Sequence, residues 1–162
     1  MIIIHFTKRF LMQSKLITQA GALKLSKFYK IAMVSGSFDL LHAGHLHLLK
    51  MAKELTSDAK LFVLVLDDAN IKRRKGPERP INPLRLRVEQ LQENKNVDYI
   101  LPWLEEWEKI AEFVANFKPA YFIAVCNDPG IDSKRKTIEK YGGKLIIIEK
   151  LPGYSTSNLI QN

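Results

Sequence analysis

The sequence predicts one α/β domain built on a Rossmann-like, doubly wound parallel sheet of five strands. Apolar runs of strand length alternate with segments of helical periodicity along the chain. The runs are nearly unbroken, which is typical of strands buried on both faces of a parallel sheet. No linker, repeat or low-complexity tract interrupts this alternation over 162 residues, a length that usually forms a single domain.

The first part of the chain supplies a leading helix and two strands. Residues 1–30 are predicted to be an N-terminal extension whose helix covers 13–29, where apolar residues recur at helical spacing. The apolar run 31–34 predicts the first strand, and the unbroken run 61–66 predicts the second. Leu46, Leu49 and Ala52 recur with helical spacing and indicate a helix over 44–55.

The remaining elements follow from local signals. Pro83 suits the first turn of a helix, Pro119 ends one, and Gly142 with Gly143 closes another. Residues 31–162 are expected to form the domain that carries the site. The helices are expected over 83–94, 105–117 and 133–141, and the strands over 97–101, 121–125 and 145–148.

The composition excludes some classes of protein for this chain. The single cysteine, Cys126, excludes an internal disulfide and fits a reducing compartment, so a cytoplasmic location is expected. No apolar run approaches the roughly 20 residues that a membrane span needs. The basic Lys8 and Arg9 follow the apolar N-terminal stretch, which is the wrong order for a secretory signal. No membrane association is therefore expected.

The formal net charge of +8 has two interpretations. A basic stripe can neutralise nucleic-acid phosphates, and an enzyme that handles a nucleoside triphosphate also needs local positive charge. Basic residues concentrate at 72–75 and 134–136, and no aromatic residue interleaves the first cluster. Most of the excess is interpreted as a solvated basic surface, and nucleic acid is not expected as a partner. A nucleic-acid-binding module stays open as an alternative.

The stretch 35–49 leads from the first strand into a helix. Gly36 permits a ligand to approach the backbone closely, and Gly44 permits a tight start of the helix. A helix N-terminus presents unpaired N–H groups and partial positive charge, which suit phosphate. His42 and His45 lie beside this terminus, so both could donate hydrogen bonds to one phosphoryl group.

Other roles for these histidines compete. With His47 they suggest a metal cluster, but His45 and His47 are two residues apart on a helix and point to nearly opposite faces. No metal site is therefore predicted. A purely structural capping role for His42 and His45 remains open.

The longer motif Gly36-Ser37-Phe38-Asp39-Leu40-Leu41-His42-Ala43-Gly44-His45 resembles the nucleotidyltransferase superfamily with a His-x-Gly-His motif. This superfamily includes glycerol-phosphate cytidylyltransferase, heptose-phosphate adenylyltransferase and archaeal FAD synthetase. The resemblance implies that His42 and His45 are catalytic and that Asp39 has a role in the site, either contacting the acceptor, to which it is assigned, or orienting the histidines. It also implies nucleotide-binding roles for Gly36, Ser37, Phe38 and Gly44.

The charged, proline-rich stretch 67–83 is predicted to be a surface loop, either simply solvated or used to grip phosphate. Its pattern Lys72-x-x-Lys75-Gly76-Pro77-x-Arg79-Pro80-Ile81-x-Pro83 looks like the corresponding loop of heptose-phosphate adenylyltransferases. The resemblance implies that Lys72 and Lys75 are catalytic, that Arg87 contacts phosphates, and that Arg79 is a weaker candidate near the acceptor.

Two further segments complete the predicted site. Ser155-Thr156-Ser157 offers favourable helix N-caps, and in the family a similar sequence binds the triphosphate. Asn127-Asp128-Pro129-Gly130 is a good turn by itself. In the family this place carries an acid and often a lysine. Here only Asp128 remains, assigned to the nucleotide, and no lysine lies between Tyr121 and Ser133. The identity of the acceptor is therefore open.

The resemblance implies transfer of a nucleotidyl group from a nucleoside triphosphate to a sugar- or polyol-phosphate acceptor, with release of pyrophosphate. ATP is favoured, because the loop at 72–83 matches adenylyltransferases, and Mg²⁺ is expected with the nucleotide. The alternatives are a CTP-dependent enzyme of the glycerol-phosphate type and a non-catalytic nucleotide-binding protein on the same fold. A homodimer is expected from the resemblance alone.

Overall fold

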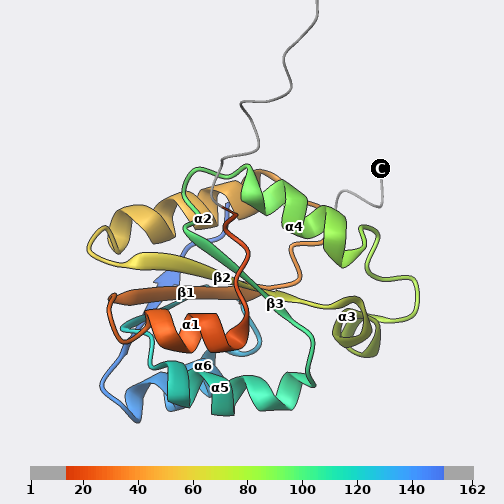
Figure 1. Ribbon diagram of the computed structural model, residues 1–162. Helices are drawn as coiled ribbons and strands as arrows, with labels where there is room; N and C mark the ends of the chain where they lie inside the picture. The colour runs from red at the N-terminus through yellow and green to blue at the C-terminus, as the bar shows by residue number, and fades with distance from the viewer. Residues whose placement is uncertain (1–13, 152–162) are drawn as a thin grey trace, which may run out of the picture.

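A computed structural model of the chain describes residues 14–151. A five-stranded parallel sheet lies between two layers of helices (Figure 1), which confirms the predicted fold class. The strands are β1 (Ile31–Gly36), β2 (Lys60–Leu66), β3 (Tyr99–Trp103), β4 (Tyr121–Val125) and β5 (Lys144–Ile148). The helices are α1 (Gln19–Leu25), α2 (Ala43–Leu55), α3 (Asp68–Lys75), α4 (Leu84–Gln92), α5 (Ile110–Phe117) and α6 (Ile131–Glu139), with a 3-10 turn η2 at Trp107–Lys109.

The strand order β3-β2-β1-β4-β5 places β1 at the centre of the sheet. Along the chain, β2 and then β3 are added on one side of β1, and β4 and then β5 are added on its other side. The order therefore reverses between β1 and β4, which pair through Ala32, Met33 and Val34. Ligands of open α/β sheets bind beyond the carboxyl ends of the strands at such a reversal. The segments that follow Gly36 and Val125 border this point.

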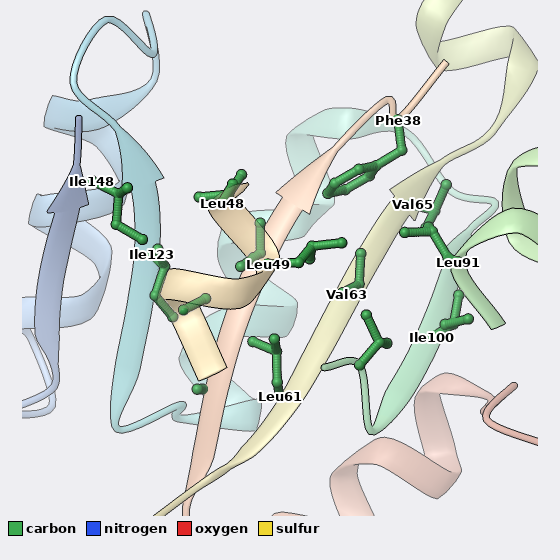
Figure 2. Close-up of a cluster of buried hydrophobic side chains, with 14 of the residues drawn as sticks. Phe38, Leu48, Leu49, Leu61, Val63, Val65, Leu91, Ile100, Ile123 and Ile148 are labelled. Atoms are coloured by element: carbon green, nitrogen blue, oxygen red, sulfur yellow. The ribbon is translucent and has the colours of Figure 1, made fainter. Parts of the chain in front are cut away.

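Two apolar clusters cover the two faces of the sheet. On one face α2 and α4 pack Leu49 and Leu91 against Val34 and Val63 (Figure 2). On the other face lie α1, α5 and α6, and the cluster there includes Phe62, Trp103, Phe113, Phe117 and Ile138. The unbroken apolar runs in the sequence follow from this burial on both sides.

The N-terminal segment packs on the sheet. Ile17 N–H donates to the Ile100 carbonyl (2.9 Å), and Ile100 N–H donates to the Lys15 carbonyl (2.8 Å). These bonds extend the sheet beyond β3. The helix α1 is shorter than predicted because Thr18 caps it, accepting a hydrogen bond from Gly21 N–H (3.1 Å). Within residues 14–151, no helix is long and apolar enough to cross a membrane.

The prediction of a loop over 67–83 was wrong in its first half, which forms the helix α3. Asp67 begins this helix, because its carboxylate accepts from the backbone N–H (2.8 Å) and the side-chain amide (2.7 Å) of Asn70. Ile71 is buried. The helix ends at Gly76, whose φ of 99° only glycine adopts readily. The last turn of α3 therefore presents its four basic residues at a fixed place.

Candidate functional site

His42 begins α2. Its Nδ1 accepts a hydrogen bond from Gly44 N–H at 3.1 Å, so the neutral ring carries its proton on Nε2. Burial, followed by the charge of Lys150, lowers the pKa of His42 from its ordinary value. The capping role expected as an alternative is real, and it leaves Nε2–H free to donate.

His45 lies one turn into the same helix, with its ring 3.9 Å from that of His42 between centroids. Burial, followed by the charge of His42, lowers the pKa of His45 to about 4. Both rings are therefore neutral donors at pH 7. Nδ1 of His45 is buried and has no hydrogen-bond partner among the described residues. Such an atom fits a polar ligand, since buried polar atoms are normally paired.

Phe38 packs against His45. Its ring lies 5.2 Å from that of His45, and its backbone has a φ of 48°, a strained value for a residue with a side chain. A Cβ on Gly36 would lie 3.1 Å from Cε2 of Phe38, so glycine is needed there for the phenyl ring. Phe38 is buried. The Phe38 ring thus packs against His45, and the contact of Phe38 with nucleotide stays a prediction.

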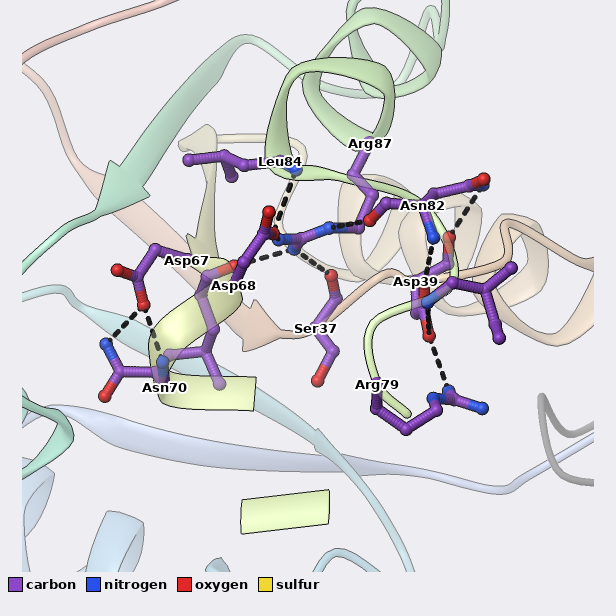
Figure 3. A network of polar contacts seen from close by, with 11 residues as sticks. Ser37, Asp39, Asp67, Asp68, Asn70, Arg79, Asn82, Leu84 and Arg87 are labelled. Carbon is purple, nitrogen blue, oxygen red and sulfur yellow. Dashed lines mark hydrogen bonds and ion pairs between the residues drawn. The ribbon is translucent and has the colours of Figure 1, made fainter. Parts of the chain in front are cut away.

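Asp39 links this turn to the segment before α4 (Figure 3). Its carboxylate accepts from Ile81 N–H (3.1 Å), Asn82 N–H (2.9 Å) and the Arg79 guanidinium (2.7 Å), and it is 1% exposed. Both carboxylate oxygens of Asp39 thus bind the chain itself, and its contact with the acceptor stays a prediction. Arg79 is held beside the site by this ion pair, and its Nε is buried with no partner in the described part of the chain.

Arg87 is fully buried, with an exposed fraction of 0%. Its guanidinium donates to the carbonyls of Ser37 (2.6 Å), Leu66 (2.6 Å) and Asn82 (3.0 Å) and pairs with Asp68 (2.6 Å), as Figure 3 shows. In this structure the donors of Arg87 go to the ends of β1 and β2, to Asn82 and to Asp68, and the contact of Arg87 with phosphate stays a prediction. Arg87 fixes the turns that follow these strands.

The last turn of α3 supplies exposed cations. Lys75 lies near the histidines, since its charge contributes to the lowered pKa of His45. Partial burial, followed by the charge of Arg79, lowers the pKa of Lys75. Lys72 is exposed one turn earlier. The guanidinium of Arg74 lies 3.9 Å from the centre of the Trp107 ring. The structure thus brings Lys75 to the predicted site.

Asp128 follows β4 and shapes the turn there. Its carboxylate accepts from Gly130 N–H (2.7 Å) and pairs with the ammonium of Lys134 in α6. The chain thus places a lysine at this edge of the sheet after all, although the sequence between Tyr121 and Ser133 contains none. Ser35, Ser37 and Gly44 are half-buried around the end of β1. Ser155, Thr156 and Ser157 lie outside the described residues.

Two neutral imidazoles at a helix N-terminus, with a lysine beside them at the carboxyl edge of a parallel sheet, define a site of the nucleotidyltransferase class. The family is established by a match between a family model and most of the sequence. The chain belongs to the cytidylyltransferase-like family, whose model matches residues 33–162. The predicted superfamily and its class of enzyme, a nucleotidyltransferase, are confirmed at this level.

Several curated relatives share the printed name "Bifunctional protein HldE". The protein of this name from Coxiella burnetii is 35% identical over 132 residues, which cover 81% of this chain and 27% of that protein. Its counterpart in Helicobacter hepaticus is 35% identical over 155 residues, covering 93% of this chain and 30% of that protein. The chain therefore spans less than a third of the length of these relatives.

Solved structures share the fold. A lipopolysaccharide core biosynthesis protein from Thermoplasma volcanium superposes with a TM-score of 0.59 and 26% identity, covering 76% of this chain and 97% of that one. Pantothenate synthetase from Thermus thermophilus superposes with a TM-score of 0.57 at 16% identity, covering 84% of this chain and 62% of that one. The second likeness shows the fold alone.

Proposed function

We propose that this chain transfers a nucleotidyl group from a nucleoside triphosphate, AMP from ATP in the favoured case, to the phosphate of a phosphorylated sugar or polyol. The observation that carries the proposal is the pair of neutral histidines at the N-terminus of α2. The similarity to HldE proteins and the resemblance of residues 72–83 to heptose-phosphate adenylyltransferases support ATP and a sugar phosphate.

An oxygen of the acceptor phosphate attacks the α-phosphorus of the nucleotide. A new P–O bond forms, the bond from the α-phosphorus to the bridging oxygen of the β-phosphate breaks, and pyrophosphate leaves with that electron pair. The protein has to position these groups and stabilise their charge. His42 and His45 donate to oxygens of the α- and β-phosphates. Lys75, with Lys72 nearby, stabilises the extra negative charge around phosphorus.

The remaining predicted residues divide between binding and positioning. Ser37 and Gly44 border the phosphate site, and Ser155 to Ser157 stay proposed as the holders of the leaving pyrophosphate. Asp39 and Arg87 are proposed to position other residues of the site, because their side chains are buried and hydrogen-bonded to the chain. Asp128 acts through Lys134.

Mg²⁺ enters this proposal with the nucleotide. Within residues 14–151, no three side chains of His, Cys, Asp or Glu gather to hold a metal ion. The proposal therefore assigns no protein ligands to the cation; Mg²⁺ bound to the triphosphate would neutralise part of the phosphate charge. A homodimer and a cytoplasmic location belong to the same proposal and rest on the resemblance and on the cysteine content.

The test is release of pyrophosphate from ATP and from CTP, with Mg²⁺, against a panel of sugar and polyol phosphates. We expect release with ATP and one class of acceptor. Release with CTP and glycerol phosphate would instead favour the cytidylyltransferase alternative. Nucleotide binding without release from any member of the panel would favour a non-catalytic nucleotide-binding protein.

We predict that His45→Ala lowers turnover by about 10² to 10³, the usual effect of losing one donor to the transition state. His47→Ala is the matched control, because His47 is on the same helix but lines a separate groove between α2 and α4. An unchanged rate in His45→Ala would remove this histidine from the mechanism.

A further inference from the structure

The amino ends of the strands meet at the edge of the sheet that lies opposite the histidines. Figure 1 shows the turns that lead into β1 and β2 on the left, and α3, which belongs to the candidate site, on the right. The helices α2, α5 and α6 end at this edge, because each returns the chain to the start of the next strand. Its exposed and half-buried side chains are called here the amino-end surface: Lys27, Phe28, Tyr29, Lys30, Leu55, Asp58, Lys60, Lys118, Lys140 and Lys144.

Direct contacts join the middle of this surface. Lys60 N–H donates to the Lys30 carbonyl (2.8 Å), so the starts of β1 and β2 lie side by side. The ammonium of Lys30 lies 4.7 Å from the centre of the Tyr121 ring at the start of β4, and that of Lys60 lies 5.8 Å from the centre of the Tyr29 ring. Lys144, which begins β5, is the register partner of Tyr121. The surface therefore runs without a break across β2, β1, β4 and β5.

The amino-end surface carries more positive charge than nearby carboxylates neutralise. Asp58 pairs with Lys30 at 2.5 Å, and the ammonium of Lys60 lies 3.9 Å from the Asp98 carboxylate. The other lysines have no ion pair within residues 14–151; they are Lys27, Lys118, Lys140 and Lys144. A concentrated excess of positive charge attracts an extended anionic partner.

Exposed apolar side chains lie among these lysines. Phe28 is 73% exposed, the highest fraction for a large apolar side chain in the described part of the chain. Leu55, the last residue of α2, is 52% exposed. The N–H groups of Phe28 and Tyr29 both donate to the Leu25 carbonyl at 3.0 Å. Backbone hydrogen bonds thus hold the turn that presents the phenyl ring to solvent.

Helix ends explain only part of this composition. The last carbonyl groups of a helix carry partial negative charge and favour a nearby cation. Lys118 and Lys140 are the C-cap residues of α5 and α6 and fit this preference. The preference does not account for Lys144 at the start of a strand, and it gives no reason for an exposed phenyl ring.

We propose that the amino-end surface binds an anionic lipid bilayer, with its lysines at the head groups and with Phe28 and Leu55 at the boundary of the acyl chains. Each lysine near such a bilayer strengthens binding about fivefold, and apolar side chains add the burial of their own surface. This contact is peripheral. The expectation of no membrane association rested on the lack of a spanning segment and of a secretory signal, and neither bears on a contact of this kind.

Nucleic acid is the competing class of partner. Arginine suits that partner, because its planar guanidinium binds phosphate through two parallel hydrogen bonds and stacks on bases. Every cation of the amino-end surface is a lysine, whereas the described arginines lie on α3, on α4, on the segment before α4 and on α6. The aliphatic side chain of Leu55 also offers a base no platform for stacking. The composition therefore favours a lipid surface.

Binding in this orientation leaves the candidate site open to solvent. The strand β1 has six residues, so about 20 Å separates its start, at the amino-end surface, from its end, where the histidines begin α2. Soluble substrates can therefore reach the site of a membrane-bound molecule. The proposal is independent of the reaction proposed above.

The first experiment measures cosedimentation of the full chain with vesicles of phosphatidylglycerol and phosphatidylcholine in equal parts, and with vesicles of phosphatidylcholine alone. We expect binding to the anionic vesicles only, weakening as the salt concentration rises. The double variant Lys27→Gln/Lys144→Gln should bind about tenfold more weakly or less, because it loses two charges at the surface.

A charge-matched double variant, Arg85→Gln/Lys109→Gln, is the control. Both side chains are exposed and lie toward the carboxyl end of the sheet, at the start of α4 and in η2. This variant loses the same net charge and should bind vesicles almost as the wild-type protein does. Absence of binding by the wild-type protein, or an equal loss in the two double variants, would overturn the proposal.

The second experiment places a tryptophan in the apolar part of the surface. Bromine atoms on acyl chains quench an indole that reaches them, so anionic vesicles with brominated chains should quench the added fluorescence of Phe28→Trp, relative to the wild-type protein with its Trp103 and Trp107. Leu104→Trp is the control, because Leu104 is 67% exposed just after β3, at the other end of the sheet. Quenching that is equal in the two variants would contradict the proposed orientation.

A single-stranded oligonucleotide tests the competing partner. Binding of the oligonucleotide that is lost in Phe28→Ser, with no binding to anionic vesicles, would assign the surface to nucleic acid and overturn the proposal. Neither vesicle experiment depends on pyrophosphate release, so the proposed reaction and the proposed membrane contact can fail separately.

Discussion

A buried neutral histidine makes folding sensitive to pH. The pKa of His45 is about 4 in the folded chain and about 6.5 in an unfolded chain. Between these values the unfolded chain binds more protons, so acidification destabilises the fold. The packing of the Phe38 ring against His45 contributes to this environment.

We predict that lowering the pH from about 7.5 to about 5 reduces the free energy of unfolding by about 2 kcal/mol through His45 alone. Urea denaturation at several pH values measures this. His45→Gln should remove the contribution of His45 to the dependence of the free energy of unfolding on pH. A smaller contribution from His42, whose pKa is also lowered, should remain. His47→Gln should keep the full slope. Equal slopes in all three proteins would contradict the prediction.

Arg87 shows how a charged residue can be structural. We predict that Arg87→Met lowers the free energy of unfolding by about 3 kcal/mol or more, because it leaves carbonyls of Ser37 and Leu66 and the carboxylate of Asp68 without their donor. Chemical denaturation measures this.

Arg85→Met is the control on the same helix. Arg85 is exposed and pairs with Glu89 alone among the described residues, a surface contact worth about 0.5 kcal/mol. If Arg87 held phosphate instead, Arg87→Met would weaken nucleotide binding while the stability stayed that of the wild-type protein.

At the scale of elements, α3 was missed because its sequence lacks a hydrophobic stripe. Only Ile71 among its apolar positions is buried in the core cluster, and four basic residues follow. The signal that could have found it is local: Asp67 followed three residues later by Asn70 is a capping pattern. The third strand was predicted over 97–101, two residues earlier than β3. β3 includes Pro102, which is tolerated because β3 pairs along its length with β2 and meets the N-terminal segment at Ile100.

The glycines that close α6 have separable roles. A Cβ on Gly143 would lie 2.4 Å from Cγ1 of Ile138 and 2.8 Å from the Pro119 carbonyl oxygen. Gly142 has a φ of 80° with no atom within 4 Å of such a Cβ. We predict that Gly143→Ala costs about 2 kcal/mol or more through overpacking, and that Gly142→Ala costs about 1 kcal/mol through backbone strain. Thermal unfolding of both variants measures the two losses of stability. A larger loss of stability in Gly142→Ala than in Gly143→Ala would contradict the prediction.

At the scale of the whole molecule, the alternation of strands and helices was enough to predict the sheet, because a parallel sheet imposes that alternation on any sequence that forms it. The candidate histidines and Lys75 were predicted from two local motifs, at 36–45 and 72–83, and the structure places them near one another. The inward orientation of Arg87 and the pairing of Asp128 with Lys134 could not be predicted, because both depend on which face of a helix meets which strand.

The position of β1 between β2 and β4 also bears on how the protein could be divided. The β1–β2–β3 half holds the histidines and the α3 cations, whereas the β4–β5 half supplies Asp128 and Lys134. Neither polypeptide half contains all the candidate site residues. Cleavage near η2, which joins the two halves, would yield two inactive fragments. Recovery of turnover on mixing would show that the fragments had reassociated into the native fold.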